Sequence, residues 1–248
     1  MRRGRAQNLR LRGRPVPPPA LPGAAEAGVT GSQGTARRPA PLRRVMPEKV
    51  LVIACGMLAR EVLAVKEKLD LAHLDLKCLP AELHFQPQRI PDAVDAAIAR
   101  AKEEGYRHIF IGYGDCGTGG MLDKVLERHG VARMEGPHCF ATYQGAAAFE
   151  AVAEADVTSF YMTDFLCRHF DAFFIRPLGL DRHPELAQDL FANYEKVVYL
   201  AQTVNPELEA VARNAAAMLG LAFEKRVTLY GDLEPVLMRA ASKPTGTT

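Results

Sequence analysis

The chain has 248 residues, of which 48% are hydrophobic and 24% are charged. This is enough apolar material for one sizeable core, and the length does not require two folded domains. The formal net charge of +2 is unevenly distributed, because residues 1–45 hold ten arginines and a single acidic residue. The rest of the chain carries 21 basic and 28 acidic residues, which argues against the basic face that a nucleic-acid-binding domain needs.

The sequence also argues against two other classes of protein. No stretch approaches the ~20 apolar residues that span a bilayer, and the N-terminus lacks the continuous apolar segment of a secretory signal. Five cysteines in a chain that can form a core do not resemble a disulfide-dense secreted scaffold. We therefore expect a cytoplasmic protein whose reduced thiols serve metal binding or catalysis.

The first part of the chain differs in composition from the rest. Residues 1–45 are dominated by Arg, Pro, Ala and Gly, which cannot bury enough apolar area to offset the entropy of ordering, so we predict disorder there and at 243–248. Three interpretations of residues 1–45 are open. They form an organellar transit peptide, they form a nucleic-acid-binding arm, or they are sequence upstream of a true start at Met46. The prolines argue against an amphipathic transit helix, which favours the start at Met46.

The predicted folded part, residues 46–242, alternates apolar runs with helical periodicity. The expected strands are 49–54, 74–79, 108–113, 131–134, 157–162, 196–200 and 222–229. The expected helices are 58–69, 91–104, 121–129, 184–194 and 206–219, and 157–162 is alternatively the start of a helix. This alternation predicts a single α/β domain with a mostly parallel sheet flanked by helices, doubly wound and Rossmann-like.

Three cysteines follow predicted strands. Cys55 comes directly after the first strand, Cys116 just after the third, and Cys139 a few residues after the fourth. If the strand order is 2-1-3, Cys55 and Cys116 converge on one crevice at the carboxyl edge of the sheet, and Cys139 could reach it. Cys78 and Cys167 lie inside predicted elements and are expected to be core residues.

Three thiolates are a suitable ligand set for one divalent metal ion, with zinc favoured and His138, water or substrate as the fourth ligand. An open fourth position would make the protein a metal-dependent enzyme that acts on a small molecule. The ion would activate a water for hydrolysis or a substrate thiol for alkyl transfer. The alternative is that the cysteines are buried core residues, because the sequence contains no Cys-x-x-Cys pair.

The segment 112–117, GYGDCG, has the glycine spacing of a dinucleotide-binding turn and lies between a strand and a helix. Its place after the third strand departs from the usual form. Gly114, Gly117 and Gly119 are candidates for binding a nucleotide or adenosyl cofactor, in an enzyme that uses a cysteine nucleophile. Alternatively, the loop forms a backbone nest around whatever Cys116 holds.

Two further residues are candidate catalytic groups. Asp164 could orient a ligand-bound histidine or accept a proton, or it caps a helix and pairs with Arg168. His183 could act as an acid or base, or it is a solvated loop histidine. Glu61 follows Cys55 on a predicted helix and faces either the crevice or solvent, whereas His84 has no partner at metal-ligand spacing.

Several segments together resemble a known family. They are ACGML at 54–58, GYGDCGTGG at 112–120, HC at 138–139, FYMTDF at 160–165 and LGLDRHPEL at 178–186. The chain resembles, over roughly residues 48–240, the uncharacterised family called domain of unknown function 1638. Its motifs include Cys55, Cys116 and Cys139, which favours a shared cysteine site.

The resemblance implies no defined activity. It implies an association with corrinoid-dependent methyltransferase systems and one-carbon metabolism. A corrinoid is therefore a further candidate cofactor. The alternative to an enzyme is a non-catalytic accessory protein that binds a metal or corrinoid for a partner methyltransferase.

Overall fold

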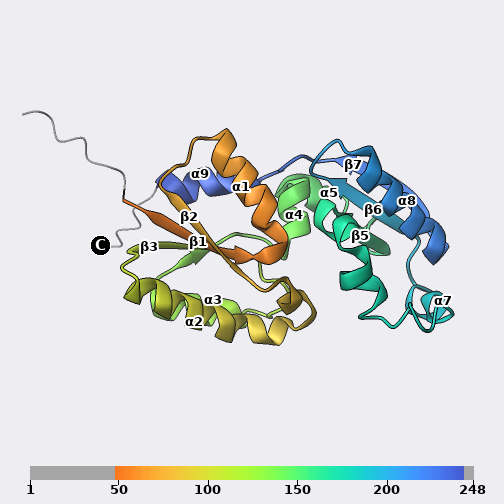
Figure 1. Ribbon diagram of the computed structural model, residues 1–248, viewed down its shortest axis with the longest axis horizontal. Helices are drawn as coiled ribbons and strands as arrows, with labels where there is room; N and C mark the ends of the chain where they lie inside the picture. Colours follow the sequence, from red (N-terminus) through yellow and green to blue (C-terminus); the bar gives the residue numbers. More distant parts are fainter. Residues whose placement is uncertain (1–47, 243–248) are drawn as a thin grey trace, which may run out of the picture. The chain divides into compact units, whose positions relative to one another are not determined.

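The computed structural model describes residues 48–242, which belong to one compact unit (Figure 1). The strands are β1 (Val50–Cys55), β2 (Leu74–Leu79), β3 (His108–Gly112), β4 (Ala132–Arg133), β5 (Ser159–Thr163), β6 (Lys196–Ala201) and β7 (Ala222–Val227). The predictions for residues 1–45 and 243–248, including a start at Met46, lie outside the described residues.

The helices fall into long and short groups. The long ones are α1 (Ala59–Lys68), α2 (Ile90–Glu103), α3 (Met121–His129), α8 (Pro206–Leu219) and α9 (Leu233–Ser242). The short ones are α4 (Cys139–Gln144), α5 (Ala146–Ala151), α6 (Asp164–Arg168) and α7 (Leu186–Leu190). Single turns are η1 (Gly56–Leu58), η2 (Ala81–Phe85), η3 (Pro87–Arg89) and the π-helical η4 (Asp171–Ile175).

All strand pairs are parallel, in two sheets of order β2-β1-β3-β4 and β5-β6-β7. The α/β class with helices flanking parallel strands is therefore confirmed, and β1 and β3 are neighbours as the 2-1-3 order predicts. The first sheet ends at β4, which pairs with β3 over only two residues, and the chain then forms α4 and α5 before β5 begins the second sheet.

The two faces of the first sheet are covered by different helices. Leu51 and Ile53 of β1 pack with the apolar side chains of α2 and α3, and Val52 and Ala54 pack with those of α1 and α9. Figure 1 shows α9 beside α1, although they lie at opposite ends of the described chain. Alternating side chains of a strand point to opposite faces, so a run that is apolar throughout predicts burial on both faces.

The second sheet also contributes to two cores. Its Val197, Tyr199 and Ala201 pack against α8 and the segment around η4. Val198 and Leu200, on the opposite face of β6, belong to the same core as Val52 and Ala54 of the first sheet. A continuous apolar core therefore joins the carboxyl halves of β1 and β6.

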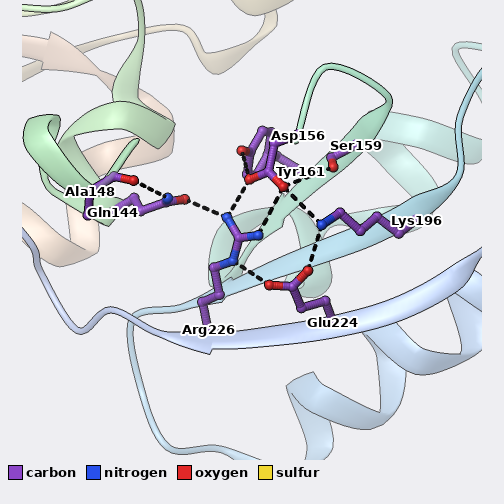
Figure 2. A network of polar contacts seen from close by, with 8 residues as sticks. All are labelled: Gln144, Ala148, Asp156, Ser159, Tyr161, Lys196, Glu224 and Arg226. Carbon is purple, nitrogen blue, oxygen red and sulfur yellow. Dashed lines mark hydrogen bonds and ion pairs between the residues drawn. The ribbon is translucent and has the colours of Figure 1, made fainter. Parts of the chain in front are cut away.

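A polar network surrounds Asp156, which precedes β5 (Figure 2). Its carboxylate accepts hydrogen bonds from Arg226 of β7 and from the Tyr161 hydroxyl at 2.6 Å, and it forms an ion pair of 2.9 Å with Lys196. Arg226 and Lys196 also pair with Glu224. The network therefore ties the loop before β5 to β6 and β7, the other two strands of this sheet.

Three helices of the structure were not predicted, namely α4, α5 and α9, and the helix predicted over 184–194 is reduced to α7. Two of the unpredicted helices have only six residues each, too short to show a helical period. Within residues 48–242, no helix combines the length and apolarity that crossing a membrane requires.

Candidate functional site

Cys55, Cys116 and Cys139 line one small cavity at the carboxyl ends of β1 and β3. Cys55 is the last residue of β1, Cys116 lies in the loop after β3, and Cys139 begins α4. The cavity has a volume of about 20 Å³, which is room for about one water-sized particle. The structure thus brings the three predicted residues together from three separate segments of the chain.

The remaining wall of this three-cysteine pocket includes two methionines and two residues with polar rings. They are Met57, Met134, His84 and Tyr113. Their spacing in the sequence carries no signal, because His84 reaches the pocket from η2, a turn that follows the neighbouring strand β2. Only the fold shows that it shares a cavity with the cysteines.

The side chains do not form a preassembled metal centre. Among the residues from 48 to 242, no three His, Cys, Asp or Glu side chains are grouped closely enough to hold a metal ion. The three cysteines share a cavity wall, but they are not grouped as a set of metal ligands. The metal and the zinc ligands therefore stay predictions.

Burial holds the three thiols in their protonated form. It raises the pKa of Cys55, raises that of Cys116 to about 11 and places that of Cys139 well above its ordinary value. The neighbouring thiols add to the rise, since two thiolates would repel each other. Burial also lowers the pKa of His84, which favours a neutral imidazole.

His138 is not part of the cavity wall. It is the N-cap residue of α4, where its ring nitrogen Nδ1 accepts from the Ala141 amide at 3.4 Å. Its ring packs edge-on against Phe149, with centroids 5.2 Å apart, and tilted against Phe140. The structure thus gives His138 a capping and packing role, and its role as a fourth metal ligand stays a prediction.

The glycine-rich loop is organised by its own carboxylate. Asp115 accepts hydrogen bonds from the amides of Gly117, Gly119 and Gly120 at 2.9–3.2 Å, and from the Thr118 hydroxyl. Amides that would cradle a phosphate in a dinucleotide site are therefore already used. These hydrogen bonds favour the alternative that the loop shapes the surroundings of Cys116 over the alternative that it binds a nucleotide.

Gly114 has a packing role in the same loop. A Cβ at this position would lie 2.8 Å from the carbonyl oxygen of Gly136 and 2.9 Å from the amide nitrogen of His138. The loop after β3 and the segment before α4 approach closely there, and the Cys116 amide donates to the Pro137 carbonyl at 2.7 Å. The absent side chain thus lets Cys116 and Cys139 border one cavity.

Asp164 is fully buried and bonded on both carboxylate oxygens. Oδ1 accepts from the Tyr199 hydroxyl at 2.7 Å and from the Gln202 amide at 3.2 Å. Oδ2 accepts from the Thr203 hydroxyl and, at 3.4 Å, from Arg168. These bonds join the end of β5 to β6 and the segment after it. The predicted pair with Arg168 is present, but the residue that caps α6 is Thr163 and not Asp164. The catalytic role stays a prediction.

His183 lies away from the pocket. Its side chain is 61% exposed, and its Nδ1 is 3.2 Å from the Glu185 carboxylate. The structure does not bring it together with the cysteines, which matches the alternative of a solvated loop histidine.

Glu61 faces inward, the less common arrangement for a charged residue. The residue is only 4% exposed, and burial raises the pKa of its carboxyl group. Burial is the main cause of the high pKa of the nearby Tyr143, and the charge of Glu61 is the second cause. The sequence offered only its position six residues after Cys55, near the start of α1, which does not separate the two faces of that helix.

The two remaining cysteines differ. Cys167 is buried as predicted, and burial raises its pKa to about 12. Cys78 is exposed, so its assignment to the core was wrong. The reason is that β2 is the edge strand of its sheet, paired only with β1.

We expect a thiol reagent to distinguish these environments. At pH 7.5, iodoacetamide should modify Cys78 at least about tenfold faster than Cys55, Cys116 or Cys139, because only exposed thiols with accessible thiolate react readily. Peptide mass spectrometry of a labelling time course measures each rate. Faster labelling of one pocket thiol would instead support the alternative of a cysteine nucleophile.

The family model described as protein of unknown function (DUF1638) matches residues 78–237. The match begins in β2 and includes Cys116, Cys139 and Asp164, whereas β1 and Cys55 precede it. A comparison with curated proteins gave no match to the chain. Because the family model covers more than half of the chain, the protein belongs to this family of unknown function.

Proposed function

We propose that the protein binds one thiophilic divalent metal ion, zinc foremost, through Cys55, Cys116 and Cys139, and that it acts there on a small molecule. The observation that carries this proposal is the shared cavity, lined by three cysteines and two methionines and large enough for about one small particle. Its place at the carboxyl ends of parallel strands is where α/β proteins bind their ligands.

The donor chemistry supports a soft or borderline ion. Thiolate and thioether groups select Zn²⁺, Cu⁺ and iron over Mg²⁺ or Ca²⁺. Zinc with three protein ligands keeps an open position, as catalytic sites do. The sulfur atoms would need to change rotamer to meet at one ion, since they are not grouped as ligands among the described residues; such a change moves a cysteine sulfur without moving the backbone.

The protonated state of the pocket thiols supports their role as metal ligands over a role as a cysteine nucleophile. A nucleophile must be a thiolate, whereas burial keeps the pocket thiols protonated, with a pKa of about 11 for Cys116. A bound cation supplies the missing positive charge and displaces the protons. The high pKa values therefore fit ligands that ionise only when the ion arrives.

A bound ion of this kind supplies Lewis acidity and a coordination position for water or substrate. Hydrolysis and alkyl transfer are both compatible with the donor set. The corrinoid and adenosyl cofactors, the methyltransferase partner and the accessory role remain predictions of the sequence.

The test is metal content. The full chain, purified anaerobically, stripped with a chelator and reloaded with Zn²⁺, should retain about one ion per chain after desalting. The Cys55→Ser/Cys116→Ser/Cys139→Ser variant should retain none, because hydroxyl groups are poor zinc ligands. Reloading with Co²⁺ should add thiolate-to-metal charge-transfer absorption, which the triple variant lacks.

The matched control is Cys78→Ser/Cys167→Ser, which changes the two cysteines outside the pocket and should retain the ion. Circular dichroism checks that each variant is folded. Zinc retained by the folded triple variant, or absent from the reloaded wild type, would refute the proposal.

A further inference from the structure

The three-cysteine pocket is almost closed in this structure. Its volume of about 20 Å³ holds about one water-sized particle, whereas pockets that bind small molecules are on the order of 300–1,000 Å³. Among the residues that line the pocket, His84 is exposed and the others are buried or half-buried. Neighbouring atoms still remove enough water from the His84 ring to lower its pKa. The boundary between the pocket and solvent is therefore at His84.

His84 lies in a segment that is weakly attached to the rest of the fold. Residues 81–89 form η2 and η3, which connect β2 to α2, and none of these residues is buried. The hydrogen bonds of the segment run within residues 80–89, such as the 2.8 Å bond from Arg89 Nη1 to Gln86 Oε1. Within residues 48–242, none of them reaches η4 or the loop after β3. Segments with so few buried contacts open locally at a low cost in free energy.

Side-chain contacts hold the segment against its surroundings at three places. His84 lines the pocket itself, together with the three cysteines. Pro87 packs beside the glycine-rich loop, because a Cβ on Gly117 would lie 3.5 Å from the Pro87 Cβ. The ring of Phe85 lies against that of Phe173 in η4, with centroids 5.7 Å apart. The segment therefore connects the pocket wall, the glycine-rich loop and η4 through packing alone.

The contact between Phe85 and Phe173 joins a weakly held residue to a firmly held one. Phe85 is 45% exposed. Phe173 also packs edge-on against Phe165, with centroids 5.0 Å apart, and its neighbour Phe174 is buried in the core of the second sheet. A single pair of rings contributes only modestly to stability. Breaking this pair would therefore release the segment while η4 stays in place.

We propose that residues 81–89 form a cap that closes the three-cysteine pocket, with Phe85 packed on Phe173 as its latch. Opening of the 81–89 cap moves His84 away from the pocket and admits an ion or a small molecule to the thiols, as lid segments do in many enzymes. This inference deepens the proposed function, because it names what controls access to the same site, and it rests on that function for the identity of what enters.

The experiment measures how often the pocket thiols become accessible. The full chain, reduced and stripped of metal with a chelator, is labelled with iodoacetamide, and peptide mass spectrometry gives a rate for each cysteine. Phe85→Ala should accelerate the labelling of Cys55, Cys116 and Cys139 by about three- to tenfold, because the loss of one ring pair shifts the cap toward its open state. Phe173→Leu removes the other ring of the latch and should act in the same direction.

The two remaining cysteines are internal controls in every sample. Cys78 is exposed and lies outside the pocket, so its labelling rate should not change. Cys167 is buried in the core of the second sheet, and it should be labelled faster only if the whole protein unfolds more often.

Two variants are matched to Phe85→Ala. Phe85→Tyr keeps the ring pair and should be labelled at the wild-type rates. Leu63→Ala removes an apolar side chain of α1 that is 52% exposed and lies outside the cap, and it should also leave all rates unchanged. Circular dichroism checks that each variant is folded.

Unchanged rates for the pocket thiols in both Phe85→Ala and Phe173→Leu would overturn the inference. An equal acceleration of Cys167 would also overturn it, because the thiols would then be reached by global unfolding. Zinc content after reloading the same proteins separates the two proposals. Faster pocket labelling in a protein that retains no zinc refutes the metal site alone, and retained zinc with unchanged labelling refutes the cap alone.

Discussion

Asp164→Ala is expected to lower the free energy of unfolding by about 3–5 kcal/mol, the cost of removing one partner from a buried charged network. The change leaves the hydroxyl of the fully buried Tyr199 and the Gln202 amide without their acceptor. It also leaves Arg168 without its carboxylate. Urea unfolding at pH 7, followed by circular dichroism, measures the loss.

The control for this variant is Asp171→Ala. Asp171 is exposed and pairs with Arg176, which is also exposed, so its removal should change the stability by no more than about 0.5 kcal/mol. A loss below about 1 kcal/mol for Asp164→Ala would contradict the structural role. In that case the catalytic role predicted from the sequence would regain support.

Asp156→Asn is expected to be the second most destabilising change, by about 3 kcal/mol at pH 7. Asp156 is the acceptor that Arg226, Lys196 and Tyr161 share (Figure 2). Its side chain is 3% exposed, so solvent cannot replace the lost charge. The asparagine keeps the shape but leaves Glu224 as the one carboxylate that pairs with both cations among the described residues.

The pH dependence of this difference follows from the same contacts. The hydrogen bond from Arg226, followed by those from Tyr161 and Lys196, holds the pKa of Asp156 well below its ordinary value of 3.8. A carboxyl group with a lowered pKa stabilises the fold above the unfolded-state pKa, and this contribution is lost as the pH falls below it. The stability gap between wild type and Asp156→Asn should therefore be constant near neutral pH and narrow below about pH 4.

Urea titrations from pH 7 to pH 3 measure that gap. Asp123→Asn is the control, because Asp123 pairs with Arg133 but its side chain is 44% exposed, and it should cost less than about 1 kcal/mol. A gap for Asp156→Asn that stays constant down to pH 3 would show that the charge of Asp156 does not act as the contacts indicate.

The local sequence was sufficient for much of the fold. The apolar runs of β1, β3 and β6 and the helical periods of α2, α3 and α8 are visible in the chain, because burial on both faces of a strand or one face of a helix leaves a regular pattern. The placement of Cys55 and Cys116 at neighbouring strand ends followed from parallel topology. These inferences needed only residue patterns within short stretches of the sequence.

Other features depended on contacts between distant segments. Helix α9 completes a core with α1, and the strands divide into two sheets after the short strand β4. Neither leaves a signature within a short window of sequence. The exposure of Cys78 likewise follows from which strand lies at the edge of the sheet, a property of the assembled sheet.

The polar residues show the same division most clearly. The residue types of Cys55, Cys116 and Cys139 and their positions after strands suggested a common site. Their shared cavity and the inward orientation of Glu61 arise from the packing of segments that are remote in the chain. The same packing removes water from these groups, which raises the pKa values of Cys55 and Glu61. A linear pattern records which groups are present, whereas their pKa values and partners depend on which other segments exclude water from them.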